Sequence, residues 1–285
     1  MSRARVIKIV SNQYTLLLED SQKVVASARG KLHLSLSPLV GDYVEYVVDN
    51  GHYLIEKVTK RINELSRPSI ANVDQAVIVM SLHQPDFSYQ LVDRLLFLIV
   101  IKDIKPAILL TKTDLAKNDE EIQAVINEYA KAGYLIGSSA DSEFVRNLFK
   151  DKLSVLTGQS GVGKSTILNN LDVGVKIATQ PISKALGRGK HTTRHVELFE
   201  ISQGWVGDTP GFSSLDFSKI SSRELREKIP DFQLAQKCKY DDCHHDKEPG
   251  CKVKEGVEKG FISKRRYEDY LAVLPLCDKI KEWEQ

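Results

Sequence analysis

The stretch that decides the fold is Leu153-Ser-Val-Leu-Thr-Gly-Gln-Ser-Gly-Val-Gly-Lys-Ser-Thr166. An apolar, strand-like run leads into a glycine-rich turn, which runs into a predicted helix. Four positions have the spacing of the phosphate-binding loop G-x-x-x-x-G-K-[ST]: Gly158, Gly163, Lys164 and Ser165. Glycines let the backbone curl around a polyphosphate with its N–H groups pointing inward, and the helix directs its positive end at the anion. The stretch predicts a nucleotide site, the alternative being a chance glycine turn.

Different residues of this loop are expected to contact the phosphates and the magnesium ion. Lys164 is expected to reach the outer phosphates, and the Ser165 hydroxyl is expected to hold Mg²⁺. The nucleotide contacts that we expect from the loop are Gly158, Gln159, Ser160, Gly161, Val162, Gly163, Lys164, Ser165 and Thr166.

Length and composition indicate a soluble globular protein with more than one domain. The 285 residues carry a formal charge of only +2, so any basic surface must be local. No apolar run approaches the ~20 residues of a membrane-spanning helix, and Met1–Arg5 leads into a strand pattern rather than a signal-peptide core. Three of the four cysteines crowd between 238 and 251, which favours metal binding over a disulfide framework. We therefore expect a cytoplasmic protein with no membrane partner.

Residues 1–65 read as a small antiparallel β-barrel. β-branched and aromatic residues recur in short runs separated by turn signals, and five strands would make an OB-type barrel. The runs are Arg5–Val10, Tyr14–Glu19, Lys23–Ala28 and Tyr43–Val48. A basic rim for RNA could come from Arg3, Arg5, Lys8, Arg29 and Lys31. The alternative is that these charges are simply solvated.

Residues 66–219 alternate strands and helices, which predicts an α/β domain with a mostly parallel sheet. The expected elements are a strand over 75–82, a helix over 89–100 capped by Ser88, a strand over 106–110, a helix over 119–132 and a strand over 134–137. Polar segments follow several strands, and ligands on such sheets lie beyond the carboxyl ends. These segments are Thr111-Lys-Thr-Asp114, Ser138-Ser-Ala140, the phosphate loop and Asp208-Thr-Pro-Gly211.

Together these segments predict a GTPase site, although 111–114 alone could be a loop cap and 208–211 alone a β-turn. The Asp114 carboxylate can accept two N–H bonds from guanine, which adenine does not offer, so it selects the base. Guanine-side contacts are expected from Thr111, Lys112, Thr113, Asp114, Ser138, Ser139 and Ala140. On the phosphate side, Asp208 is expected to contact Mg²⁺ through water, Gly211 to sense the γ-phosphate, and Thr192 or Thr193 to complete the Mg²⁺ shell.

The order of these motifs is unusual, because the guanine-type segments precede the phosphate loop. A site requires proximity in space rather than a fixed chain order, and a sheet can be permuted when its original ends lie close together. In this order the γ-phosphate-sensing segment lies next to whatever follows Ser218. Our hypothesis is that nucleotide state passes directly to the last domain. Hydrogen exchange in that domain, compared between GTP and GDP, tests it.

His191 is the candidate catalytic residue. Small GTPases often position water with a Gln after Asp-x-x-Gly, but Phe212 stands there in this chain. His191 either orients the attacking water or is a loop histidine that contacts phosphate or RNA. A catalytic role predicts that His191→Ala slows turnover and spares GTP binding.

Residues 220–285 read as a mostly helical zinc-binding domain. Cys238, Cys243, His245 and Cys251 suit a closed tetrahedral Zn²⁺ site, although spacing alone leaves His244 open. In so small a segment zinc is expected to replace a hydrophobic core. Lys264, Arg265 and Arg266 form either a phosphate-contacting cluster or a solvated helix start, and Cys277 is expected in a core.

Over essentially its whole length the chain resembles the circularly permuted, small-subunit-dependent GTPases of bacteria, the RsgA family. The resemblance rests on Val40-Gly-Asp-Tyr-Val44, the permuted motif order, Gly187-Arg-Gly-Lys-His-Thr-Thr193 and the Cys238/Cys243/His245/Cys251 pattern. It implies GTP hydrolysis stimulated by the small (30S) ribosomal subunit, late in the maturation of that subunit. It also implies rRNA contacts by the OB and zinc domains, one structural Zn²⁺ held by His245 rather than His244, Mg²⁺ with GTP, and a catalytic His191. We expect a monomer.

One position departs from the general GTPase pattern, because Thr111 stands where that motif has Asn. The lost amide is expected to loosen loop packing or guanine affinity, while Asp114 keeps the base choice. Two other function classes remain: an ATP-dependent kinase or ATPase, and a zinc-and-barrel RNA-binding scaffold that nucleotide merely stabilises. Asp114→Asn separates the first from a GTPase, and slow hydrolysis with and without small subunits would favour the scaffold.

Overall fold

The computed structural model describes residues 2–29, 36–66, 69–171, 196–207 and 215–279, to which all structural statements refer. The chain divides into two compact units, each assembled from segments distant in sequence. The first comprises Met1–Ala76, Glu143–Ser160 and Lys164–Gly211, and the second Val77–Ser142, Gly161–Gly163 and Phe212–Gln285. The predicted domain boundaries near 65 and 219 stay a prediction.

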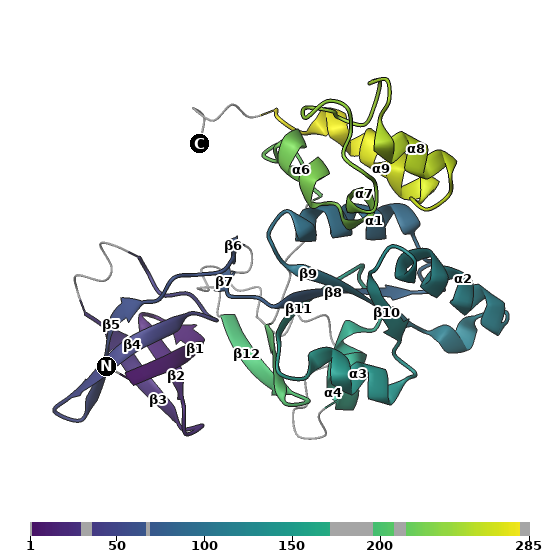
Figure 1. The fold of residues 1–285 in the computed structure, drawn as a ribbon. Helices are drawn as coiled ribbons and strands as arrows, with labels where there is room; N and C mark the ends of the chain where they lie inside the picture. The colour runs from purple at the N-terminus through teal and green to yellow at the C-terminus, as the bar shows by residue number, and fades with distance from the viewer. Residues whose placement is uncertain (1, 30–35, 67–68, 172–195, 208–214, 280–285) are drawn as a thin grey trace. The chain divides into compact units, whose positions relative to one another are not determined.

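A five-stranded barrel opens the first unit (Figure 1). Its strands are β1 (Ser2–Val10), β2 (Gln13–Leu18), β3 (Lys23–Ala28), β4 (Tyr43–Asp49) and β5 (His52–Val58). They run in the order β1-β2-β3-β5-β4, and β4 pairs back onto β1 to close the barrel. Val6, Leu16, Val44 and Ile55 fill the interior with no exposed surface. The predicted OB-like barrel is confirmed, with β5 as the strand that the sequence patterns did not single out.

The same unit continues from β1 into the strand that carries the phosphate loop, in the order β11-β13-β12-β1. These strands are β11 (Leu153–Thr157), β12 (Val196–Ile201) and β13 (Gly204–Gly207), with the short pair β6 (Glu64–Ser66) and β7 (Ser69–Ala71) nearby in the chain. The helices are α3 (Ser142–Phe149), missed from the sequence, and α4 (Lys164–Leu171). Gly204 is required sterically, because a Cβ there would lie 1.9 Å from the Phe149 carbonyl oxygen.

The second unit contains the guanine-type loops on the strand order β10-β9-β8. Its elements are β8 (Gln75–Ser81, which begins in the first unit), α1 (Tyr89–Val100), β9 (Lys105–Thr111), the 3₁₀ turn η2 (Thr113–Leu115), α2 (Asp119–Ala130) and β10 (Leu135–Ser138). β9 and β10 are parallel. The Ser88 hydroxyl accepts the Leu91 N–H at 3.3 Å and caps α1 as predicted. The predicted alternation of strands and helices is confirmed.

The C-terminal helices pack on α1 within the same unit (Figure 1). They are α6 (Ser222–Lys228), α7 (Pro230–Gln233), α8 (Lys252–Glu258), α9 (Lys264–Val273) and the 3₁₀ turn η3 (Leu274–Leu276). An apolar core joins Phe97 of α1 to Leu225 and Tyr270, and Cys243 and Cys251 lie in it. The expectation that zinc replaces a hydrophobic core is therefore wrong, because α1 supplies one wall of a core that these helices lack alone.

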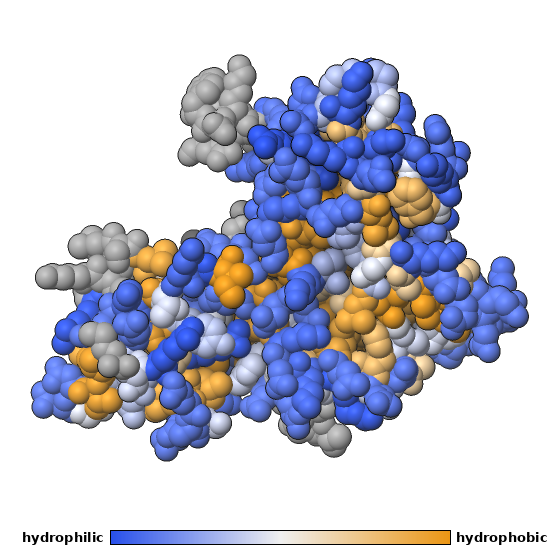
Figure 2. Space-filling model, in the orientation of Figure 1, coloured by the Kyte–Doolittle hydropathy of each residue, from blue (hydrophilic) through white to orange (hydrophobic). Residues whose placement is uncertain are grey.

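The surface of this region agrees with that core. On the face in Figure 2, hydrophilic residues cover most of the outward side of α6–α9, as expected when their apolar residues turn inward. Cys277, predicted to be a core residue, is 7% exposed. None of the helices in the described ranges is both long and apolar enough to cross a membrane.

Candidate functional site

The phosphate loop links β11 to α4 through glycines in a left-handed conformation. The φ angles of Gly158, Gly161 and Gly163 are 133°, 82° and 95°. A Cβ on Gly161 or Gly163 would meet nothing within 4 Å, so the backbone conformation, rather than space, requires glycine. The Lys164 ammonium turns back onto the loop and donates to the carbonyl oxygens of Gly158 at 2.8 Å and Gln159 at 2.6 Å. Burial lowers the pKa of this half-buried lysine.

The second unit brings the two guanine-type segments together. The hydroxyls of Thr113 and Ser138 lie 3.1 Å apart, and the Ser139 N–H donates to the Leu110 carbonyl at 2.7 Å. The Ser138 hydroxyl also accepts the Ala140 N–H at 3.1 Å, which shapes the second loop. Asp114 is exposed between these contacts, so its carboxylate is open to a ligand.

Lys112 and Thr111 are held by backbone carbonyls. Lys112 adopts a left-handed φ of 52°, and its ammonium donates to the Gln84 carbonyl in the loop after β8. The Thr111 hydroxyl, in a residue only 4% exposed, donates to the Val162 carbonyl of the phosphate loop at 2.6 Å. This hydrogen bond ties β9 to the phosphate loop, and the expected loosening relative to Asn stays a prediction. The effect of Thr111 on guanine affinity stays a prediction.

Five predicted site residues lie outside the described part of the chain. They are His191, Thr192, Thr193, Asp208 and Gly211. Their roles stay predictions from the sequence.

The metal-binding residues converge as the spacing predicted. The ligand atoms of Cys238, Cys243, His245 and Cys251 all lie within 4.8 Å of one another. The His245 Nδ1 lies 3.6 Å from the Cys238 sulfur and 3.4 Å from the Cys251 sulfur, and these two sulfurs are 3.9 Å apart. A tetrahedral Zn²⁺ with Zn–S bonds of ~2.3 Å spaces its ligand atoms by about 3.5–3.8 Å. The donor set therefore fits a four-coordinate metal ion, with His245 rather than His244 in the cluster.

The surroundings of the cluster also suit a cation. Burial raises the pKa of Cys243 to about 12 and lowers the pKa of His245 to about 4. A thiolate at Cys243 therefore needs a positive charge nearby, and the imidazole of His245 is already in its neutral, ligating form. Two backbone N–H groups point at the sulfurs, from Lys252 to Cys238 at 3.3 Å and from Lys254 to Cys251 at 3.5 Å.

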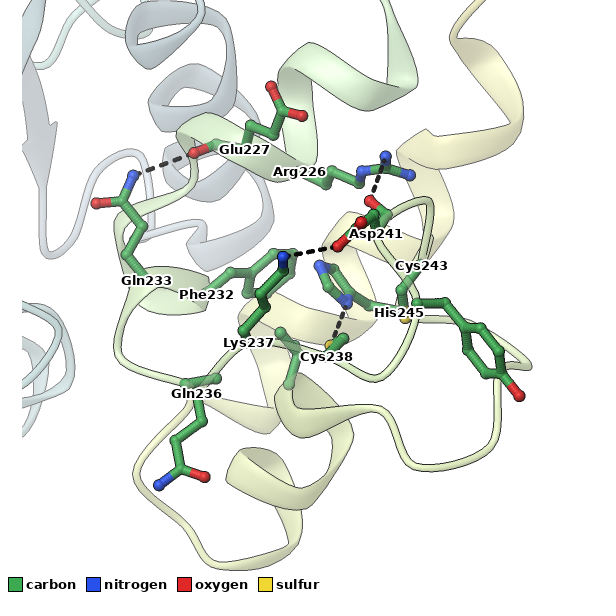
Figure 3. Close-up of a pocket in the computed structure, with 13 residues that line it drawn as sticks. Arg226, Glu227, Phe232, Gln233, Gln236, Lys237, Cys238, Asp241, Cys243 and His245 are labelled. Atoms are coloured by element: carbon green, nitrogen blue, oxygen red, sulfur yellow. Dashed lines mark hydrogen bonds and ion pairs between the residues drawn. The ribbon is translucent and has the colours of Figure 1, made fainter.

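A pocket of about 360 Å³ borders the cluster (Figure 3). Phe232 lies edge-on to His245, with ring centroids 5.3 Å apart, and forms the apolar wall of the pocket. Arg226, 8% exposed, fixes the cysteine-bearing loop by donating to the carbonyls of Asp241 and Asp242 at 3.3 and 2.8 Å. The pocket is lined by the same side chains that position the metal ligands, so it belongs to the cluster.

The structure separates the basic residues predicted to rim the barrel. Lys8 pairs with Glu197 at 2.9 Å and Arg29 pairs with Glu56 at 2.6 Å, whereas Lys31 lies outside the described residues. The guanidinium groups of Arg3 and Arg5 lie over the Tyr43 ring, 4.3 and 5.2 Å from its centroid. Arg3 and Arg5 are thus the rim positions that form no ion pair within the described ranges.

Arg266 is the residue whose role the sequence misassigned. It is 1% exposed, so it is neither solvated nor a phosphate contact. Its Nε donates to Asp231 Oδ1 at 2.8 Å and its Nη1 to Asp93 Oδ1 at 3.4 Å, and both carboxylates are also 1% exposed. The short run of basic residues at 264–266 gave no sign of these partners, which lie on α7 and α1.

Guanine-type loops that precede the phosphate loop in the chain define the class of circularly permuted GTPases. Residues 58–218 match the model of the RsgA GTPase family. The chain belongs to that family.

Several relatives are similar over nearly the full chain. The small ribosomal subunit biogenesis GTPase RsgA 2 of Oceanobacillus iheyensis is 47% identical over 96% of this chain and 97% of its own. The small ribosomal subunit biogenesis GTPase RsgA of Bacillus subtilis is 45% identical over 95% and 96%. Among solved structures, YloQ, described as a circularly permuted GTPase, gives a TM-score of 0.82 at 37% identity over 96% and 94%. YjeQ from Thermotoga maritima gives 0.83 at 33% identity over 96% and 97%.

Proposed function

We propose that this protein is a GTPase that converts GTP to GDP and phosphate while acting in the biogenesis of the small ribosomal subunit. The near-full-length identity to relatives named for that role carries the proposal. The contacts that join residues 111–114 to 138–140 support it, because they hold the exposed Asp114 in a position to read a base. The protein acts in the cytoplasm as a monomer.

On the guanine side, Asp114 accepts the two N–H bonds of the base, and the stem of Lys112 covers the ring while Gln84 holds its ammonium. Ser138, Ser139 and Ala140 close over the base through backbone groups. On the phosphate side, Lys164 exchanges the carbonyls of Gly158 and Gln159 for phosphate oxygens when GTP binds.

Magnesium and water have their own residues in this proposal. Ser165 and either Thr192 or Thr193 would hold Mg²⁺, with Asp208 contacting it through water, and the bound ion would neutralise charge on the β- and γ-phosphates. Gly211 senses the γ-phosphate. His191 orients the attacking water and takes the place of the Gln that other GTPases use.

The Cys238, Cys243, His245 and Cys251 cluster holds one structural Zn²⁺, because three thiolates and one imidazole leave no open coordination position. The zinc region and the barrel contact rRNA, and on the barrel the stacked Arg3 and Arg5 are the cations best placed to meet phosphate.

GTP hydrolysis measured with purified small subunits, with large subunits and with neither tests the proposal. Stimulation by small subunits alone is expected. Equal stimulation by both subunits would contradict the assignment to the small subunit. Slow hydrolysis under all three conditions would favour the RNA-binding scaffold.

The nucleotide assignment has a separate test in Asp114→Asn. An amide presents a donor where guanine also presents one, so the variant is expected to lose GTP affinity and to gain affinity for xanthosine triphosphate. Loss of a hydrogen bond to a charged group costs ~1.5–3 kcal/mol, or roughly 10- to 100-fold in affinity. Unchanged nucleotide affinities would favour the ATP-dependent class.

A further inference from the structure

Four aromatic rings form a cluster where three segments of the second unit meet. Phe87 lies just before the N-cap of α1 and Tyr89 is its first residue, Tyr129 lies at the end of α2, and Tyr134 directly precedes β10. The centroids of neighbouring rings lie 4.8–6.3 Å apart. Tyr129 is 0% and Tyr134 6% exposed, whereas Phe87 and Tyr89 are half-buried, so the part of the cluster formed by α2 and the start of β10 is internal. It fixes these three segments relative to one another.

Helix α9 of the C-terminal region places two consecutive arginines on this aromatic cluster. The Arg265 guanidinium lies 3.7 Å from the Tyr89 centroid, and that of Arg266 lies 4.9 Å from Tyr129 and 5.3 Å from Tyr134. The Arg266 Nη2 also donates to the Glu128 carbonyl at the end of α2, at 3.4 Å.

Arg266 and Tyr134 share a buried acceptor. The Tyr134 hydroxyl donates to Asp231 Oδ2 at 2.9 Å, while the Arg266 Nε donates to Oδ1 of the same carboxylate. The Arg266 guanidinium therefore contacts the face of the Tyr134 ring. The Asp231 carboxylate, whose charge Arg266 neutralises, holds the Tyr134 hydroxyl. Both bonds are charge-assisted, which gives them strength and a defined geometry.

All three segments held by the aromatic cluster lead to the guanine-type loops. β10 runs from Leu135 to Ser138, whose hydroxyl lies 3.1 Å from that of Thr113. α2 begins at Asp119, a short loop after the 3₁₀ turn Thr113–Leu115 that carries Asp114. The loop before α1 supplies the Gln84 carbonyl that holds Lys112. A shift at the aromatic cluster would therefore move Asp114 and the loop that closes over the base.

We infer that Arg266 is a positioning residue for guanine recognition, acting through Tyr134 and β10 and through Tyr129 and α2. The inference rests on the proposed function, because it takes Asp114 as the base-reading group. It gives the C-terminal region a role in nucleotide choice as well as in partner contact. Since the contacts reach the base side rather than the γ-phosphate side, GDP and GTP are expected to depend on Arg266 equally.

Binding of GDP and inosine diphosphate to the full-length, metal-loaded protein tests the inference. Inosine lacks the exocyclic amine, so it loses one of the two bonds to Asp114, and the wild type is expected to prefer GDP by about tenfold or more. Arg266→Gln is expected to reduce that preference at least threefold, while the metal content is retained. Arg223→Gln is the control, because Arg223 forms only an exposed ion pair with Glu227 on α6.

Tyr134→Phe provides a second variant that removes one hydroxyl and keeps the ring, in case Arg266→Gln does not fold. It is expected to reduce the preference in the same direction. An unchanged ratio of the two dissociation constants in the folded variant, with both affinities shifted together or not at all, would show a purely structural arginine and overturn the inference. Absence of any GDP preference in the wild type would instead refute base reading by Asp114, and with it the proposed function.

Discussion

Two buried polar clusters in the second unit contrast in how the chain builds them. The metal-binding cluster draws its four ligands from residues 238–251, a single loop whose last ligand, Cys251, is the N-cap of α8. The Arg266 cluster draws its groups from α1, α7, α9 and the end of α2. The ligands of the metal-binding cluster are close together in the sequence, whereas the groups of the Arg266 cluster come together only when the helices pack.

The two clusters also differ in charge. The metal site gathers three thiols, and burial raises the pKa of Cys243 so that its thiolate needs a cation nearby, whereas Arg266 provides one positive charge for the two carboxylates of Asp93 and Asp231. The first cluster is therefore sensitive to loss of the metal ion and the second to loss of a single side chain. The contrast shows that a recognisable spacing motif is not required for a polar group to organise a core.

Removal of the metal is expected to have the largest effect. Cys243→Ser should abolish stoichiometric zinc binding, because it removes one of the four ligands. The loss of stability should be large, because structural zinc sites contribute about 10–16 kcal/mol of apparent binding free energy. The core shared with α1 is expected to keep part of the helical content. Zinc analysis, circular dichroism and urea unfolding with and without chelator measure this. Cys277→Ser is the control, since Cys277 is buried outside the cluster. Full zinc occupancy in Cys243→Ser would contradict the site.

Arg266→Met is expected to have the next largest effect. It leaves the carboxylates of Asp93 and Asp231 buried without their cation, which costs about 3–5 kcal/mol of unfolding free energy. Adding Asp231→Asn should recover part of the loss, and the double-mutant cycle measures the coupling. Arg223→Met, in an exposed pair, should cost less than ~1 kcal/mol. Equal losses for the two arginines would remove the distinction drawn between the clusters.

The pH dependence of stability sharpens the comparison further. Burial raises the pKa of Asp93 to about 7, with Asp269 adding to the shift and Arg266 and Tyr129 opposing it. At pH values between the ordinary aspartate pKa, near 4, and the raised pKa of about 7, Asp93 holds a proton in the folded state that it has released in the unfolded state. Stability is therefore lost as pH rises through this window, by up to ~1.4 kcal/mol per pH unit from this group. Asp93→Asn should flatten that slope in urea unfolding from about pH 4 to about pH 7. A slope identical to wild type would contradict the assignment.

Arg265→Ala is expected to have the smallest effect. Its guanidinium stacks on Tyr89, but the side chain is 46% exposed and its nearest carboxylate, Glu128, is 4.0 Å away. A cation–π contact at an exposed site contributes about 0.5–1 kcal/mol. Thermal or urea unfolding should show this small loss beside the large one at Arg266. A loss as large as that of Arg266→Met would mean that stacking, and not ion pairing, holds α9.

Local signals in the sequence were sufficient for most of the fold. Ser88 was predicted as a helix cap and accepts the expected backbone N–H group, from Leu91. The strands β8, β9 and β11 were found as continuous apolar runs and are buried. β5 was missed because only Ile55 and Val58 of its residues are buried, and α3 because it has only 8 residues and, unlike the equally short α4, follows no phosphate-loop motif. Short, half-exposed elements are decided by their tertiary neighbours.

The candidate site divides in the same way. The phosphate loop and the zinc-type cysteine spacing could be predicted because their residues are close in the chain and their chemistry requires particular residue types. Arg266 was misread because its partners Asp231 and Asp93 lie 35 and 173 residues away. A basic residue at a helix start is usually solvated, and only the packed structure provides the buried carboxylates that change this.

The pairing of β1 with β12 has a consequence for synthesis of the chain. The barrel is complete at Val58, but the second half of β1 meets its other neighbour only when Glu197 has been made. Until then the nascent protein displays an open strand edge, which is a hazard for wrong association. Lys8 lies on that edge, and its charge discourages a foreign strand from adding there. Once β12 has been synthesised and pairs with β1, the Lys8 ammonium forms an ion pair with the Glu197 carboxylate at 2.9 Å. The same lysine therefore disfavours incorrect strand pairing before β12 is made and stabilises the correct pairing afterwards.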